Sequence, residues 1–316
     1  MLNRKDILGL KNMTKGEILE ILETAKEMKT RIDDSSKRID EIKGCSIVSL
    51  FYENSTRTKT SFSLAGKYLG ATVQDLGVGT SSVKKGESLI DTGKTLDQMG
   101  VKIMIMRHSM TGAPHILAKN VSAHVINAGD GSNEHPTQAL LDLFTILEYK
   151  KYFEGLKIAI IGDISHSRVA RSNVFGLSKL GANVILAGPS TLLGSSGLLG
   201  VKTTPDIKEA VKEADIVMGL RIQFERQKTI AFPDLSEYRE LFGINKEILR
   251  YAKKDVLIMH PGPVNRGIEL STDIIDSENS VINIQVKNGV AVRMAILKLL
   301  YQGGTIWNFW FKMDKS

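Results

Sequence analysis

Hydroxyl and cationic side chains are crowded at one point of the sequence, in the segment STRTKT (55–60). It follows an apolar stretch at 46–52, typical of a buried strand, and leads into a helical pattern over 57–69. The first turn of a helix offers unpaired backbone N–H groups and a partial positive charge, and an arginine adds a planar donor for oxyanions. This combination suits phosphate binding. Plain helix capping, which needs only one serine or threonine, is the alternative.

Polar groups also follow the other stretches that we expect to be strands in the first half of the chain. Arg107 follows the stretch 101–106, and His135 and Gln138 open the next helical pattern. The glycine- and serine-rich loop 79–89 carries two lysines. Alone, these features indicate a structural histidine and an ordinary surface loop. Because ligands of open α/β sheets bind beyond the carboxyl ends of the strands, their repetition favours one shared binding site.

The second half repeats this arrangement. Arg168 lies early in a helical pattern, Arg221 and Gln223 follow an expected strand, and the turn HPGP (260–263) follows another. A surface charge is the alternative for Arg221, and a rigid turn is the alternative for the HPGP segment.

Alternation of apolar strand-like and helical stretches predicts the fold, an α/β protein with two doubly wound parallel-sheet domains. We expect a first domain over 1–150, a second over 151–288, and a long helix at 136–150 that joins them. The segment 289–316 begins with an apolar helix that we expect to dock back on the first domain. The predicted strands are 46–52, 71–76, 101–106, 122–127, 156–163, 182–188, 215–220 and 255–260; the predicted helices are 57–69, 87–99, 112–119, 136–150, 168–180, 206–213 and 289–302, after a capped helix that begins near residue 14.

Composition excludes several classes of protein. The 42 basic residues are interspersed with 35 acidic ones and form no block of like charge, so the net charge of +7 does not favour nucleic-acid binding. A single cysteine, Cys45, and the absence of CxxC and HExxH patterns predict no disulfide and no metal site. Only Gly162 is available after the strand at 156–163, which excludes a dinucleotide fingerprint. We expect no membrane span, no secretory signal and a cytoplasmic location.

Taken together, these motifs resemble the aspartate and ornithine carbamoyltransferase family. The resemblance covers almost the whole chain in the family's order. Two positions depart from the common pattern STRTR-x-SFE: Lys59 and Ser63 stand at its basic and acidic positions. These two departures affect only the ion pairing around the helix that follows the STRT segment. The matching segments are FYENSTRTKTSF (51–62), SSVKKGES (81–88), MRH (106–108), HPTQALLDL (135–143), GDISHSRVARSN (162–173), LRIQFERQ (220–227) and MHPGPVNRGIEL (259–270).

The resemblance implies a carbamoyl transfer in which an amine attacks carbamoyl phosphate directly, without a cofactor, a metal or a covalent nucleophile. The implied catalytic residues are Arg57, Thr58, Lys85, Arg107 and His135. The implied ligands of carbamoyl phosphate are Ser55, Thr56, Arg57, Thr58, Ser81, Arg107, His135, Gln138, Gly262 and Pro263. The implied ligands of the acceptor are Lys85, Arg168, Arg221 and Gln223.

Two features favour L-aspartate over ornithine as the acceptor. Pro261-Gly262-Pro263 stands where the ornithine enzymes carry Cys-Leu-Pro, and the second half has no cysteine. Arg168 and Arg221 suit two carboxylates, whereas the ammonium of ornithine would meet like charge. The alternatives are a transferase with another acceptor and a non-catalytic phosphate-binding member of the fold. The family further implies a homotrimer whose 81–85 loop reaches a neighbouring site, and it is compatible with regulatory chains or a dihydroorotase as partners.

Overall fold

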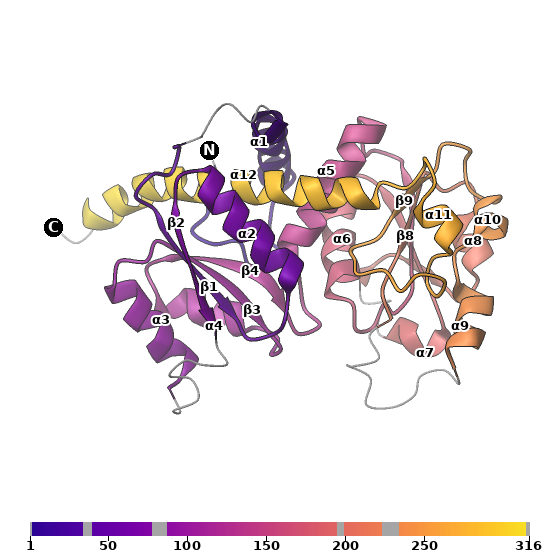
Figure 1. Cartoon of the computed structure of the whole chain (residues 1–316), viewed down its shortest axis with the longest axis horizontal. Coiled ribbons are helices and arrows are strands. Elements are labelled where there is room, and N and C mark those ends of the chain that lie inside the picture. The colour runs from indigo at the N-terminus through magenta and orange to yellow at the C-terminus, as the bar shows by residue number, and fades with distance from the viewer. Residues whose placement is uncertain (1, 34–39, 78–86, 195–198, 223–233, 314–316) are drawn as a thin grey trace. The chain divides into compact units, whose positions relative to one another are not determined.

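The computed structural model describes residues 2–33, 40–77, 87–194, 199–222 and 234–313 (Figure 1). The chain divides into two compact units, one formed by residues 1–140 and 288–316 and the other by residues 141–287. The domains expected from the sequence ended at 150 and 288; the units divide at 140 and 287, inside two long helices. Those helices are α5 (Pro136–Lys150) and α12 (Ile282–Met313).

The first unit is built on a parallel sheet with the strand order β2-β1-β3-β4. All four strands were predicted, with ends that differ by up to three residues. The strands are β1 (Ser46–Phe51), β2 (Thr72–Gly77), β3 (Ile103–His108) and β4 (His124–Asp130), and the helices are α1 (Lys15–Asp33), α2 (Thr56–Tyr68), α3 (Leu89–Gln98) and α4 (Ala113–Asn120).

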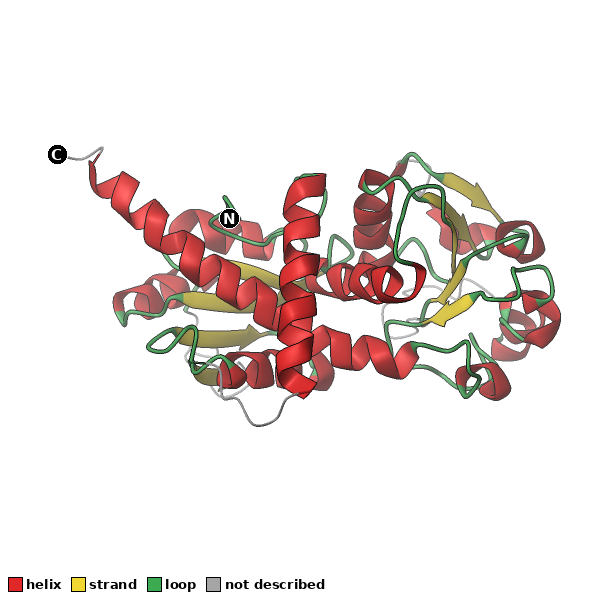
Figure 2. Ribbon diagram, turned by 90° about the horizontal axis from the view of Figure 1, so that it is seen from above, coloured by secondary structure: helices red, strands yellow, loops and turns green. Residues whose placement is uncertain are grey.

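Helices cover both faces of this sheet. Successive residues of a strand point to opposite sides, so the contacts of neighbouring residues show what packs on each face. Val48 and Met104 belong to a buried cluster with Leu117 of α4. Ile47 precedes Val48 and points to the other face, where α2 packs closely: a Cβ atom on Gly66 would lie 3.2 Å from Ile47 Cδ1. The first unit is therefore doubly wound, as predicted, and Figure 2 shows helices on both sides of its strands.

The second unit contains a five-stranded parallel sheet with the order β7-β6-β5-β8-β9. One face packs in a buried cluster on α8 and the helices that follow it, and α6 contacts the sheet at β6. The strands are β5 (Lys157–Ile161), β6 (Asn183–Ala187), β7 (Lys202–Thr204), β8 (Ile216–Gly219) and β9 (Leu257–Met259), and the helices are α6 (Arg168–Lys179), α7 (Ser190–Leu193), α8 (Ile207–Val211), α9 (Leu235–Phe242), α10 (Lys246–Leu249) and α11 (Thr272–Ile275).

The sequence patterns missed β7 and the short helices α7, α9, α10 and α11. They also placed the start of α12 at residue 289, seven residues too late. The added first turns of α12 carry Gln285 and Asn288, which are polar but buried and therefore interrupt the apolar pattern.

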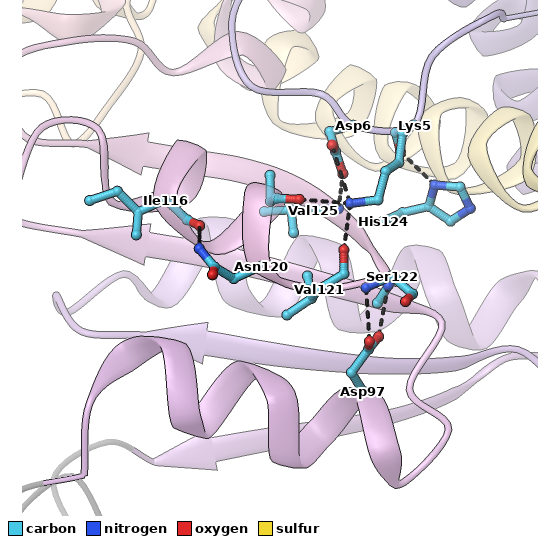
Figure 3. Close-up of polar contacts among 11 residues, drawn as sticks. Lys5, Asp6, Asp97, Ile116, Asn120, Val121, Ser122, His124 and Val125 are labelled. Atoms are coloured by element: carbon cyan, nitrogen blue, oxygen red, sulfur yellow. Dashed lines mark hydrogen bonds and ion pairs between the residues drawn. The ribbon is translucent and has the colours of Figure 1, made fainter.

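The amino-terminal segment is fixed along the free edge of β4. Ile7 N–H donates to the Val125 carbonyl at 3.0 Å, and the Val125 N–H donates to Asp6 Oδ1 at 2.7 Å. Lys5 Nζ donates to the Val121 carbonyl at 2.8 Å, at the end of α4 (Figure 3). The segment continues along β4, where the Asn127 N–H donates to the Ile7 carbonyl at 2.8 Å. No helix in the described ranges has the length and apolar content needed to cross a membrane.

Candidate functional site

The polar motifs of the first unit follow neighbouring strands at one edge of the sheet. Phe51 at the end of β1 lies opposite Arg107 of β3, and the Tyr52 N–H donates to the Arg107 carbonyl at 2.9 Å. His108 of β3 lies opposite Asp130 of β4. Because these strands are parallel, the segments that open α2 and α5 leave the sheet at this same edge.

The amino terminus of α2 has a serine cap without a side-chain hydrogen bond. Ser55 occupies the N-cap position, but its side chain accepts no hydrogen bond from the first turn, and that turn contains no acidic residue. The serine caps of α3 and α6 behave differently, since Ser88 and Ser167 accept from Asp91 N–H and Ala170 N–H. Plain helix capping, the alternative considered above, therefore does not account for the Ser55 side chain. Thr56 and Arg57 are exposed at this terminus, and Thr58 is buried.

Arg107 is oriented by an acidic neighbour to which the sequence analysis gave no role. Its Nε donates to Glu53 Oε2 at 3.2 Å, and its Nη1 lies 3.5 Å from the Ala128 carbonyl. The two side chains are only 15% and 17% exposed. An ion pair that is largely shielded from water restricts the guanidinium to few orientations.

Buried carboxylates hold the segment that carries His135. Asp130 is fully buried, and its Oδ1 accepts from Asn127 Nδ2 at 2.7 Å and from the Glu134 N–H at 3.2 Å. Glu134 is also buried and accepts from the Leu10 N–H at 2.7 Å. His135 itself is 5% exposed. Neither carboxylate has a role that the sequence patterns predict; the local signal is the polar density of NAGDGSNEHP (127–136).

The first of the two departures from the family pattern has a partner in the structure. Lys59 Nζ lies 3.5 Å from Asp75 Oδ2 of β2, and both side chains are more than a third exposed. An exposed pair of this kind contributes little stability.

The motifs of the second unit also follow adjacent strands. Ile161 of β5 lies opposite Gly219 of β8, so the ends of these strands are level. Arg168 begins α6 with a side chain only 4% exposed, and Arg221 follows β8 and is half-buried. Gly262 follows the next strand, β9.

Asp163 and His166 form a second pair near Arg168 that the sequence analysis did not single out. His166 Nδ1 lies 2.9 Å from Oδ1 of Asp163, which is fully buried. The His166 N–H also donates to this carboxylate at 3.2 Å. The pair shapes the turn between β5 and α6.

Three predicted site residues, Ser81, Lys85 and Gln223, lie outside the described residues. Within the described part of the chain, no group of three or more histidine, cysteine, aspartate or glutamate side chains is placed to hold a metal ion.

Two family models match the chain and together cover most of it. Residues 5–148 match the carbamoyl-P binding domain of the aspartate/ornithine carbamoyltransferases, and residues 154–300 match their Asp/Orn binding domain. Among similar proteins, the aspartate carbamoyltransferase catalytic subunit of Acetivibrio thermocellus is 60% identical over 301 residues, covering 95% of this chain and 96% of the relative. That of Ruminiclostridium cellulolyticum is 57% identical over 306 residues, covering 96% and 98%.

Solved structures of the two acceptor classes resemble the chain about equally well. Aspartate transcarbamoylase from Trypanosoma cruzi, in complex with carbamoyl aspartate and phosphate, aligns with a TM-score of 0.83 and 30% identity, covering 94% of this chain and 96% of that one. Ornithine carbamoyltransferase from Pyrococcus furiosus aligns with a TM-score of 0.81 and 32% identity, covering 92% and 95%.

Proposed function

Because this chain belongs to the aspartate/ornithine carbamoyltransferase family, we propose that it transfers the carbamoyl group of carbamoyl phosphate to the amino group of L-aspartate. The products are N-carbamoyl-L-aspartate and phosphate, and the reaction is an early step of de novo pyrimidine biosynthesis. One observation carries the choice of reaction: relatives at 60% and 57% identity over nearly their whole length are aspartate carbamoyltransferase catalytic subunits.

The first task of the site is to hold the phosphate and to offset its charge as it departs. In this proposal, the N–H groups and side chains at the start of α2 bind the phosphate oxygens, and Arg107, oriented by Glu53, adds a fixed positive charge. The phosphate ligands are Ser55, Thr56, Arg57, Thr58 and Arg107, assisted by Ser81 and Lys85.

The second task is to stabilise the oxyanion that forms when the amine attacks. Thr58, Arg107 and His135 are the proposed donors to the carbonyl oxygen, and a preorganised donor at such a position is worth about 3–4 kcal/mol. His135 suits this role because the buried Asp130 and Glu134 carboxylates fix the segment before it. Gln138 and the carbonyl groups of Gly262 and Pro263 are the proposed partners of the carbamoyl NH2 group.

The third task is to orient the acceptor. Arg168 and Arg221, with Gln223 and Lys85, are the proposed partners of the two carboxylates of L-aspartate. The neutral amine forms the new N–C bond, the C–O bond to phosphate breaks, and the amine proton passes to the departing phosphate. No step requires a covalent nucleophile on the protein.

The overall fold does not select the acceptor, because the aspartate and ornithine enzymes align equally well. Charge does. Arg168 is nearly fully buried, and an ornithine ammonium near it would meet like charge where solvent screening is weak.

We extend the proposal to a homotrimer with shared active sites and a cytoplasmic location. Cys45 is the single cysteine and is buried, and burial raises the pKa of its thiol to about 12, so it is an inert thiol that needs no oxidising compartment. Mixing Arg57→Ala chains with Lys85→Ala chains should restore part of the activity in hybrid trimers. If the mixture recovers no activity, the proposal of shared sites is contradicted.

Regulatory chains or a dihydroorotase are further partners that a native-mass measurement on a cell extract can detect.

The direct test is a carbamoyl transfer assay with aspartate and ornithine offered in parallel. We expect carbamoyl aspartate and stoichiometric phosphate, and no carbamoyl ornithine above background. Arg57→Gln, which keeps the volume but removes the charge, serves as the negative control. Formation of carbamoyl ornithine, or no transfer to either acceptor, would refute the proposal.

A further inference from the structure

His260 is a buried residue that closes the turn after β9. Its Nδ1 accepts a hydrogen bond from the Gly262 N–H at 2.8 Å, and the residue is 1% exposed. Gly262 has a φ of +64°, in the left-handed region that favours glycine. Because Nδ1 accepts this bond, it carries no proton, and the ring proton lies on Nε2, which is 3.6 Å from Glu269 Oε1.

A chain of buried side chains fixes the backbone of His260. Its N–H donates to Gln285 Oε1 at 3.0 Å, and Gln285 Nε2 donates to Asp142 Oδ1 at 2.8 Å. Asn173 Nδ2 donates to the other oxygen of Asp142 at 2.8 Å. All four side chains are buried, and those of Asp142 and Asn173 are fully so. The motifs HPTQALLDL and GDISHSRVARSN therefore contain residues that have no place in the proposed chemistry but hold this turn.

The ring of His260 is held on two further sides. A Cβ atom on Gly219 of β8 would lie 3.4 Å from His260 Cδ2, so the imidazole packs directly against that strand. Glu269, on the Nε2 side, accepts from the Asn265 N–H at 3.2 Å and is 1% exposed. The imidazole therefore has little room to turn, and Nδ1 points steadily at the Gly262 amide.

We propose that His260 is a positioning residue that gives the enzyme its selectivity for the carbamoyl group over other acyl phosphates. By holding the Gly262 N–H, Nδ1 fixes the turn, so that the carbonyl groups of Gly262 and Pro263 face the NH2 group of carbamoyl phosphate. This inference rests on the proposed function, in which those carbonyl groups accept from the NH2 group. An acyl phosphate that lacks NH2 gains nothing from the same turn.

The chain offers a matched pair of variants at this position. In His260→Asn, the side-chain oxygen is the same number of bonds from Cα as Nδ1 is in the wild-type histidine. This oxygen can accept from the Gly262 N–H in an Asx turn. In His260→Gln, the amide reaches the place of Nε2 and leaves the Gly262 N–H without its acceptor. Both variants keep a polar amide in the same buried space, so general damage to packing affects both alike.

The affinities of carbamoyl phosphate, acetyl phosphate and inorganic phosphate are measured by titration calorimetry on the full-length protein, and the KM for aspartate by initial rates. For His260→Gln we expect carbamoyl phosphate to bind about tenfold more weakly, because the turn is then no longer fixed in advance and has to be ordered on binding; tenfold corresponds to about 1.4 kcal/mol. The affinities of the two phosphates without NH2 should change less than about twofold on the same reasoning. His260→Asn should bind all three ligands as the wild type does.

An equal loss of affinity for all three ligands, or equal affinities in the two variants, would overturn the inference. If the variants do not fold, the wild-type protein decides: we expect a nitrogen–nitrogen scalar coupling by NMR between Gly262 N and His260 Nδ1, and a protonated Nδ1 would overturn the inference. Failure of the proposed function is distinct, since the wild-type protein would then form no carbamoyl aspartate.

Discussion

Replacing Arg107 by methionine removes a cation of the proposed phosphate site that the structure holds in an ion pair. The Arg107 side chain is 15% exposed, and its Nε lies 3.2 Å from Glu53 Oε2. A donor aimed at developing charge contributes about 3–4 kcal/mol, so Arg107→Met should lower kcat/KM by about 10² to 10³.

The same substitution leaves the Glu53 carboxylate uncompensated near the bound phosphate. At an effective dielectric constant of about 20 and a separation of about 5 Å, two like charges repel by about 3 kcal/mol. Because Glu53 is only 17% exposed, solvent screens little of this repulsion. Adding Glu53→Gln to Arg107→Met should therefore recover about tenfold or more of the lost kcat/KM, whereas Glu53→Gln alone should lower it about fivefold through poorer orientation.

The assay is the initial rate of carbamoyl aspartate formation at saturating aspartate, with carbamoyl phosphate varied, for the wild type, both single variants and the double variant. Strictly additive losses would show that Glu53 does not act through Arg107. An Arg107→Met variant within fivefold of the wild type would refute the role of Arg107 itself.

Three further predictions concern stability, pH and the acceptor. Glu134→Ala leaves the buried Leu10 N–H unsatisfied and should cost about 1–3 kcal/mol in urea unfolding; an unchanged midpoint would contradict this. Burial, helped by the Lys5 charge, lowers the folded-state pKa of His124 below 6.5. Its unfolded form therefore binds more protons, and stability should fall as the pH drops below about 6.5; an equally steep fall in His124→Gln would refute the assignment. Arg168→Lys keeps the charge but loses the bidentate fork, so the KM for aspartate should rise about tenfold while the affinity of carbamoyl phosphate stays unchanged.

The strands were predictable because both faces of a parallel sheet are buried, which makes each strand a short apolar run. The run 157–161 and the neighbouring strands of its sheet show this pattern. The edge strand β7 has the sequence KTT and only one buried residue, so no apolar run marks it.

The residues predicted for the candidate site were sought at the carboxyl ends of strands and in the segments that follow them, where a general rule of α/β sheets applies. The residues that support them follow no local rule. Gln285 and Asp142 meet across 143 positions of sequence, and Glu134 reaches the amide of Leu10 across 124. Such partners are set by tertiary packing, and one sequence carries no periodic signal for them.

We propose that the start of α2 and Arg107 bind the phosphate while Arg168 and Arg221 bind the acceptor carboxylates. A crystal structure with N-(phosphonacetyl)-L-aspartic acid, which carries a phosphonate and the two carboxylates of aspartate, tests this most directly. We predict the phosphonate against the N–H groups of the first turn of α2 and the Arg107 guanidinium, with the two carboxylates on Arg168 and Arg221. A phosphonate bound away from α2, or carboxylates that touch neither arginine, would contradict the account.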